Sequence, residues 1–164
     1  MAQPHGRRTS RGGRTAAAAS GGGQRADDLA FLERRIADRK QRLELLRTVH
    51  FEALRAGLDP QLVLGVIEVE SGFRKYAVSR AGARGYMQVM PFWVKVVGSR
   101  GDNLFHLRTN LRYGCVILRH YLDMEKGDYF RALGRYNGSL GSPEYPRAVL
   151  VAWKVRWGYQ GATS

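Results

Sequence analysis

The chain has 164 residues, of which 44% are hydrophobic, so it can bury one core and is not globally disordered. Its 27 Lys and Arg against 14 Asp and Glu give a formal net charge of +13, which favours an anionic partner: nucleic acid, lipid headgroups or an acidic cell-wall polymer. The single cysteine, Cys115, excludes an internal disulfide and a paired-thiol metal site, and we expect it to be a small buried hydrophobe.

The first 26 residues predict a disordered basic arm. They contain five arginines, no acidic residue and many Gly, Ser and Ala residues. The remaining 22 basic and 14 acidic residues still give the body a net charge of +8. Ala16 to Ala19 is too short an apolar run for a secretory signal peptide, and no run is long enough to predict a membrane span.

From Asp27 onward, apolar residues recur at spacings of three and four and no strand-like alternation is present, so the sequence predicts an all-α fold. Residues 27–58 predict an N-terminal segment of one broken or two consecutive amphipathic helices. Asp59 and Pro60 supply an N-cap and a first-turn proline for a helix over 60–71 that stops at Gly72. Further helices are expected over 91–97, 107–125, 128–136 and 143–157.

The stretch VIEVESGF, residues 66–73, places two acidic residues in an apolar segment. On a helix, Glu70 falls in the middle of the apolar stripe, whereas Glu68 falls on the polar side and is expected to be a solvated surface acid. Two interpretations of Glu70 stay open. It forms a structural ion pair with an arginine, or it is a carboxylic acid whose pKa is raised by desolvation at the floor of a cleft, helped by the negative end of the helix dipole.

The segment ESGFRKYAVSRAGARGYMQVMP, residues 70–91, resembles the signature of the soluble lytic transglycosylases, whose catalytic domains are similar to goose-type lysozyme. The shared elements are Glu-Ser, Ala-x-Ser, Gly-Ala-x-Gly, Met-Gln and Met-Pro, in that order. NLRYGCVILRHYL from Asn110 and ALGRYNGS ending at Ser139 resemble later motifs of the same family. The resemblance implies a lysozyme-like helical domain with little or no β-structure, which we assign to residues 59–160.

The activity implied by this resemblance is cleavage of the β-1,4 bond between N-acetylmuramic acid and N-acetylglucosamine in peptidoglycan. Glu70 would protonate the glycosidic oxygen, and the substrate's acetamido group would meet the developing oxocarbenium ion. The same glutamate would then take the proton from the 6-hydroxyl as a 1,6-anhydromuramoyl end forms. Such substrate-assisted enzymes need one carboxyl where ordinary glycosidases need two, and no metal or other cofactor is implied.

The resemblance also implies a set of site residues, each with a structural alternative. Ser79 would bind near the catalytic carboxyl or the acetamido group, or only stabilise a turn. Tyr136 would present its hydroxyl to Glu70 or the sugar, or be a half-buried surface aromatic. The predicted site consists of Glu70 as the catalytic residue and Ser71, Ser79, Gln88, Met90, Tyr136 and Asn137 as substrate-binding residues.

The chain departs from the family pattern at two places, and its aromatic residues are expected to divide between the groove and the core. Tyr86 stands where the family usually has Leu, and Gly138-Ser139 replaces the commoner Ala-Gly after the Tyr-Asn motif. The side chains expected to wall the groove are Phe73, Tyr76 and Tyr86, and those expected to pack in the core are Trp93, Trp153 and Trp157.

Two other functions remain as alternatives: a lysozyme-like muramidase, and a basic helical protein that binds nucleic acid through its arginine-rich arm. The second explains the charge but not the ordered motifs, so no nucleic-acid partner is expected. The expected partner is the glycan strand of peptidoglycan, bound by a monomer, with a wall-spanning or secretion machine as a further possibility. This places the protein in the periplasm or cell envelope. The missing export signal leaves open another start site, another export route, or access to the wall after lysis, as for phage enzymes.

Overall fold

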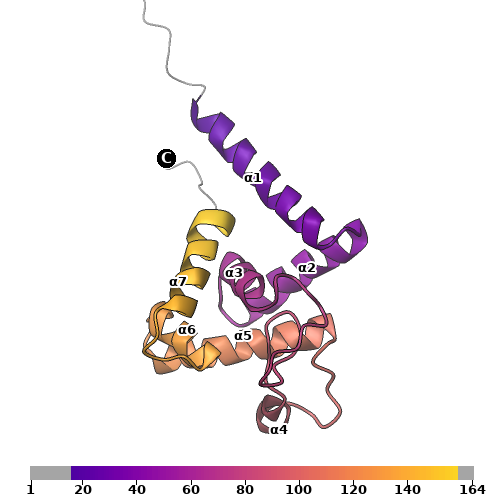
Figure 1. Ribbon diagram of the computed structural model, residues 1–164, viewed down its shortest axis with the longest axis vertical. Coiled ribbons are helices and arrows are strands. Elements are labelled where there is room, and N and C mark those ends of the chain that lie inside the picture. The colour runs from indigo at the N-terminus through magenta and orange to yellow at the C-terminus, as the bar shows by residue number, and fades with distance from the viewer. Residues whose placement is uncertain (1–15, 159–164) are drawn as a thin grey trace, which may run out of the picture.

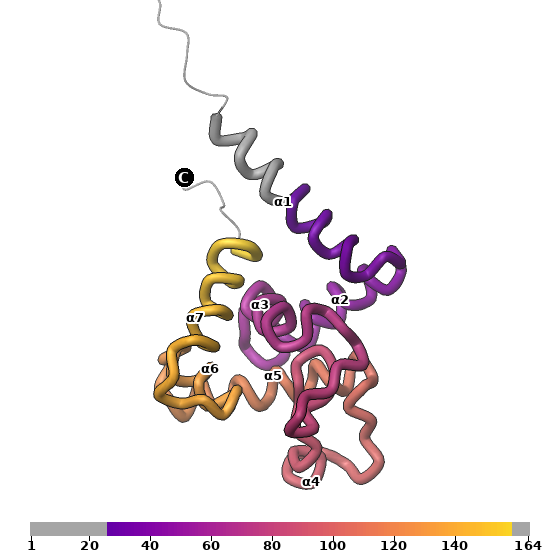
Figure 2. The backbone as a smooth tube through the Cα atoms, in the orientation of Figure 1, coloured from indigo at the N-terminus to yellow at the C-terminus, as the bar shows by residue number. Residues whose placement is uncertain are grey.

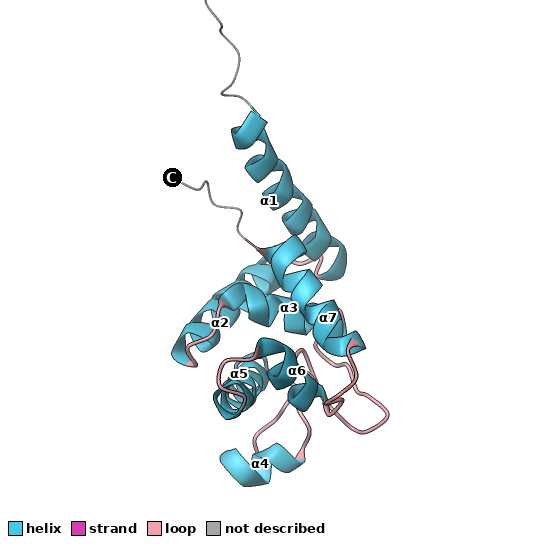
Figure 3. Ribbon diagram, turned by 90° about the vertical axis from the view of Figure 1, so that its left-hand side faces the viewer, coloured by secondary structure: helices cyan, strands magenta, loops and turns pink. Residues whose placement is uncertain are grey.

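The computed structural model describes the backbone of residues 16–158 and the side chains of residues 26–158. This part of the chain is helical and contains no β-strand, only isolated bridges that join Arg84 to Val78 and to Val89 (Figure 3). The predicted all-α class is therefore confirmed. The helices are α1 (Ala16–Arg35), α2 (Arg39–Arg55), α3 (Pro60–Ser71), α4 (Phe92–Val97), α5 (Leu107–Met124), α6 (Tyr129–Asn137), α7 (Glu144–Val151) and the π-helix η1 (Ala152–Trp157).

The N-terminal boundary differs from the prediction. Most of the predicted arm, residues 1–26, lies outside the described residues, but helix α1 begins at Ala16 rather than near Asp27. Four consecutive alanines from Ala16 to Ala19 have the highest helix propensity of any residue type, which explains why the helix starts there.

Helix boundaries elsewhere follow the predicted caps. The Asp59 side chain accepts a hydrogen bond from the Gln61 amide at 2.8 Å, Pro60 occupies the first turn, and Gly72 ends α3 in the left-handed conformation (φ 57°). The Asp128 side chain caps α6 by accepting from the Arg131 amide. Asp59, Pro60 and Gly72 thus fix both ends of α3, the helix that carries Glu70.

Helix α3 lies at the centre of the molecule, between α7 and η1 on one side and α2 on the other (Figure 1). Its residues Leu62, Val63, Val66 and Ile67 are fully buried. The backbone of η1 approaches α3 so closely that a Cβ at Gly65 would lie 3.1 Å from the backbone nitrogen of Trp153. Helix α3 therefore carries the core, and Glu70 in its last turn is held by packing on several sides.

A long irregular segment, residues 72–106, connects α3 to α5 and carries the short helix α4 away from the other helices (Figure 2). Helix α5 packs against α2 and α6, and the apolar face of α5 is buried. The irregular segment begins two residues after Glu70.

Glu68 corrects one prediction, because it is not a solvated surface acid. Its Oε1 accepts from Arg156 Nε at 2.9 Å, its Oε2 accepts from Trp157 Nε1 at 2.8 Å, and its side chain is 19% exposed. Helix η1 covers this face of α3, a tertiary contact that the periodicity of α3 alone does not reveal. Glu68 therefore joins the C-terminal helix to the core.

Replacing Glu68 by Ala is expected to lower the free energy of unfolding by about 1 to 2 kcal/mol, because two hydrogen bonds to a partly buried carboxylate are lost. Urea unfolding followed by circular dichroism measures this change. The control is Glu33→Ala, whose carboxylate is 59% exposed and 3.6 Å from Arg42. Equal losses in the two variants would show that Glu68 does not anchor η1.

Candidate active site

Glu70 has the environment of a protonated acid. Burial raises the pKa of its carboxyl from 4.5 to about 7, and the Tyr145 hydroxyl beside it lowers the pKa by a smaller amount. Among the described residues, Glu70 forms no ion pair, so the interpretation of it as a structural salt bridge is wrong. No other described carboxylate contributes to its pKa, so the described part of the site contains a single acid.

Two tyrosines lie close to Glu70. The charge of Glu70 adds to burial in raising the pKa of both Tyr136 and Tyr145, so both phenols stay neutral. The Tyr136 hydroxyl donates to the Met87 carbonyl at 2.7 Å. Its one proton is thus engaged by that carbonyl, and the phenol oxygen can still accept a hydrogen bond from Glu70 or a sugar.

Tyr145 is the site residue that the sequence interpretation missed. Its buried hydroxyl has no hydrogen bond of ordinary geometry with any described residue, although it lies near enough to Glu70 to affect the pKa of that carboxyl. Such an orphaned donor is uncommon and suits a partner whose charge changes. The sequence held one signal for it: Tyr145 lies four residues before Val149, so on a helix the two share a face, and Val149 is buried on α7.

Asn110 on α5 holds the turn formed by residues 84–87. Its Oδ1 accepts from the Met87 amide, and its Nδ2 donates to the carbonyls of Arg84 and Leu104, each at 2.8 Å. Asn110 is fully buried, so these three bonds replace water completely. At Gly85 (φ 76°) a Cβ would lie 2.5 Å from Asn110 Nδ2, which makes glycine necessary there.

Ser71 belongs to the same framework. Its side chain is 1% exposed, and its Oγ donates to the Tyr86 carbonyl at 2.7 Å, with the Ile67 carbonyl at 3.1 Å sharing the same proton. The predicted role of Ser71 in substrate binding is thus corrected: the hydroxyl faces the interior and ties the end of α3 to the turn at Tyr86.

The other predicted binding residues lie in the irregular segment between α3 and α4 and at the end of α6. The Ser79 side chain accepts from the Ala83 amide at 3.0 Å, which is the turn role that was its structural alternative. Gln88 (φ 51°) donates through Nε2 to the carbonyls of Ala77 and Gly85. Met90 is partly exposed, and Asn137 is exposed and donates to the Ser139 hydroxyl at 3.1 Å.

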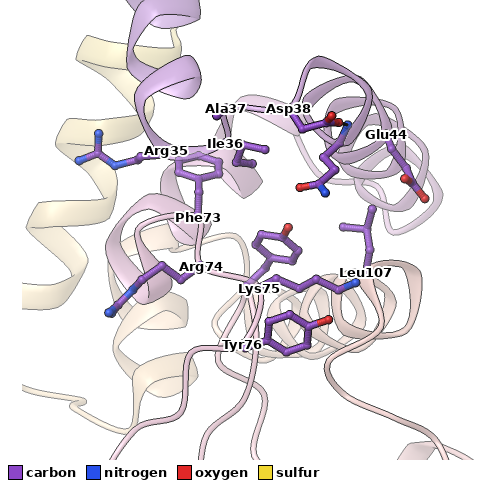
Figure 4. A pocket seen from close by; sticks show the side chains of 12 residues that line it. Arg35, Ile36, Ala37, Asp38, Glu44, Phe73, Arg74, Lys75, Tyr76 and Leu107 are labelled. Atoms are coloured by element: carbon purple, nitrogen blue, oxygen red, sulfur yellow. Dashed lines mark hydrogen bonds between the residues drawn. The ribbon is translucent and has the colours of Figure 1, made fainter.

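The aromatic residues divide between core and surface. Phe73 is buried edge-to-face against Phe31 and Trp157, so it packs in the core, and it also lines a cavity together with Tyr76 and Tyr86 (Figure 4). Trp153 is also buried, which confirms the packing role predicted for Trp153 and Trp157. Tyr76 is 70% exposed. Cys115 is buried, as predicted, and burial raises the pKa of its thiol well above the ordinary value.

The raised pKa of Glu70 predicts a pH-dependent stability. A carboxyl that binds its proton more tightly in the folded state stabilises the fold fully below about pH 4.5, and this contribution is lost as the pH rises through about 7. A pKa change from 4.5 to about 7 corresponds to about 3 kcal/mol. The free energy of unfolding of the wild type should therefore fall by up to about 3 kcal/mol more than that of Glu70→Gln when the pH is raised from about 5 to about 8.

Urea unfolding of both proteins at the two pH values measures this difference. Parallel changes in the two proteins would contradict the raised pKa.

This helical fold is shared with solved lytic transglycosylases. An inactive variant of the lytic transglycosylase Slt from Pseudomonas aeruginosa superimposes with a TM-score of 0.60 at 22% identity, covering 68% of this chain and 23% of that one. The 70 kDa soluble lytic transglycosylase from Escherichia coli gives a TM-score of 0.52 at 19% identity, covering 85% of this chain and 24% of that one.

The transglycosylase SLT domain family matches residues 47–145, and the chain belongs to this family. The transglycosylase of Enterobacteria phage PRD1 is 31% identical over 126 residues, which are 73% of this chain and 46% of that protein. The membrane-bound lytic murein transglycosylase C of Actinobacillus pleuropneumoniae is 52% identical over 52 residues, 32% of this chain and 13% of that protein. The chain thus spans less than half of the length of these relatives.

Proposed function

We propose that the protein is a peptidoglycan lytic transglycosylase that cleaves the β-1,4 bond between N-acetylmuramic acid and N-acetylglucosamine and leaves a 1,6-anhydromuramoyl end. The observation that carries this proposal is the isolated Glu70 carboxyl with a pKa of about 7. An acid with this pKa holds a proton near neutral pH and releases it readily, as a general acid must. Membership of the transglycosylase SLT domain family supplies the substrate class.

The reaction uses one carboxyl twice. Protonated Glu70 donates to the glycosidic oxygen, the N-acetylglucosamine product leaves with that proton, and the substrate's acetamido oxygen bonds to C1 of the muramic acid. Glu70, now a carboxylate, accepts the proton of the muramic acid 6-hydroxyl. The 6-oxygen displaces the acetamido oxygen at C1, which closes the 1,6-anhydro ring and restores protonated Glu70. No water is consumed.

In this mechanism, Tyr145 stabilises Glu70 in its charged state. Its hydroxyl is buried without a well-formed hydrogen bond, so its proton is available to the carboxylate formed after the first step. The Tyr136 hydroxyl donates to the Met87 carbonyl and thereby holds the turn at Met87. We further propose that Gln88 and Met90 line the glycan path, with Ser79 and Asn137 supporting the turns that border it.

The proposed partner is the glycan strand of peptidoglycan, acted on by a monomer in the periplasm or cell envelope. The formal net charge of +13 suits a polymer whose peptides carry carboxylates. None of the described helices has the length and apolar character to cross a bilayer. Among the described residues, no three His, Cys, Asp or Glu side chains are grouped as metal ligands would be.

The experiment that tests this function compares two substrates. Suspensions of purified sacculi should lose turbidity when the wild-type protein is added. Duplex DNA should bind the protein only weakly. Intact sacculi combined with tight DNA binding and a steep salt dependence would overturn the proposal in favour of a nucleic-acid-binding protein. A muramidase would also clear sacculi, and only the mass of its products distinguishes it.

A further inference from the structure

Helix α4 is apolar on every side, yet it is not buried. Five of its six residues, FWVKVV, are apolar, and none of the six is buried. The side chains of Phe92, Val96 and Val97 are 52%, 64% and 51% exposed. A helix that is apolar all round normally lies inside a protein or a membrane, so the exposed side of α4 points to a partner outside the described residues.

Helix α4 forms a fixed tip at one end of the molecule. Both views show it apart from the other helices (Figure 1, Figure 3). Its inner side is anchored, because the Trp93 ring meets the Tyr121 ring of α5 edge-to-face at 6.3 Å and Val94 packs against the core. The outer side chains are therefore held in place at the surface.

The segment that carries α4 is cationic. Residues 71–101 contain six Lys and Arg residues and no Asp or Glu. Lys95 on α4 and Arg100 after it form no ion pair with a described side chain. The next acid, Asp102, is engaged, since its Oδ2 accepts from the Tyr113 hydroxyl at 2.6 Å. The tip thus combines exposed apolar side chains with cations that are available to an anionic partner.

A protein partner and a lipid bilayer make different demands on such a tip. A stable protein interface buries about 800 Å² on each partner, from about 20 residues or more. The three exposed side chains of a six-residue helix are too few for that. A bilayer surface needs less: aromatic and aliphatic side chains enter the headgroup region, and nearby Lys and Arg are attracted to anionic lipids.

We propose that α4 docks the protein on a lipid bilayer that contains anionic lipids. Phe92, Val96 and Val97 enter the boundary between headgroups and acyl chains, while Lys95 and Arg100 pair with lipid phosphates. The lipid headgroups are thus one of the anionic partners that the net charge of +13 favours. Docking goes beyond the proposed function and does not depend on the chemistry of Glu70.

Docking through α4 holds the proposed glycan path near the membrane. Met90, which we propose lines that path, is two residues before Phe92, so their Cα atoms are at most about 7 Å apart. The docked protein therefore meets glycan strands that lie next to the membrane. This consequence rests on the proposed function, whereas the docking itself does not.

Flotation of the full chain with vesicles tests the docking. The wild type should bind vesicles of phosphatidylcholine mixed with phosphatidylglycerol. Val96→Asp should weaken this binding at least about tenfold, because the contribution of a buried valine side chain is lost. Lys95→Gln should weaken it about fivefold, the effect of one cation near an anionic surface.

The matched control is Val155→Asp, which changes the charge by the same amount. Val155 is 67% exposed on η1, on the opposite side of the molecule from α4 (Figure 1). This variant should bind the vesicles within about twofold of the wild type, because a surface charge away from the bilayer is largely screened by salt.

Fluorescence quenching separates insertion of α4 from simple attraction between a basic chain and anionic vesicles. A Phe92→Trp protein should lose fluorescence when it binds vesicles whose lipids are brominated on the acyl chains. A Val155→Trp protein should not show this additional loss. The three native tryptophans are common to both proteins, so the difference reports the introduced side chain alone.

Three results would overturn the proposal. The wild type does not bind the vesicles, or Val96→Asp and Val155→Asp bind equally well, or the bound Phe92→Trp protein is not quenched more than the Val155→Trp protein. Sedimentation without lipid tests the other occupant of the tip. A wild-type assembly that Val96→Asp converts to a monomer, without vesicle binding, would assign α4 to contact with a second copy of the chain.

Discussion

Replacing Glu70 by Gln is expected to slow glycan cleavage by about 10²- to 10⁴-fold, the usual contribution of a positioned general acid and base. The amide keeps the shape of the side chain but can neither donate an acidic proton nor accept one. Because the described site contains no second carboxylate coupled to Glu70, no other acid replaces it. Release of soluble fragments from labelled sacculi, measured as an initial rate, gives the size of the loss.

Glu68→Gln is the matched control for that experiment. Glu68 lies two residues away on the same helix, but its carboxylate binds Arg156 and Trp157 and faces η1. This variant should keep activity within a few fold of the wild type at a temperature where it is folded. A Glu70→Gln protein that keeps more than a tenth of the activity would show that another group supplies the proton.

Replacing Asn110 by Ala is expected to lower the free energy of unfolding by about 3 kcal/mol or more, because each buried polar group left without a partner costs about 1 to 3 kcal/mol. The substitution orphans the Met87 amide and the carbonyls of Arg84 and Leu104. Such a loss is a large part of the total stability of an ordinary domain. Thermal and urea unfolding measure it directly.

The control for this second prediction is Asn137→Ala, which removes the same side chain from an exposed position with one hydrogen bond to Ser139. We expect it to change the free energy of unfolding by less than about 1 kcal/mol. Comparable losses in the two variants would contradict the assignment of Asn110 as the clamp of the turn around Gly85.

Local signals predicted most of the fold. The boundaries of α3 follow from Asp59, Pro60 and Gly72, each of which acts on the backbone within a few residues. The amphipathic pattern likewise indicated α5 and α6, and periodicity placed Glu70 in the apolar stripe of α3. Such features depend on the order of neighbouring residues, and they are therefore visible in one sequence.

Features that depend on contacts between distant segments were not predictable in the same way. Glu68 is polar on the helical wheel of α3, yet it is covered by η1, about 88 residues later in the chain. The same holds for Tyr145, which comes from α7 to Glu70, and for the Ser71 hydroxyl, which turns inward to the Tyr86 carbonyl. The catalytic candidate was visible in the sequence, whereas the groups that tune and position it depend on tertiary packing.

The most direct test of the central claim is the mass of the products released from sacculi by the wild-type protein. If Glu70 acts first as acid and then as base, without water, mass spectrometry will find muropeptides that end in 1,6-anhydromuramic acid. These products should disappear with Glu70→Gln. Products larger by one water molecule, with reducing ends, would contradict the mechanism and identify the protein as a muramidase.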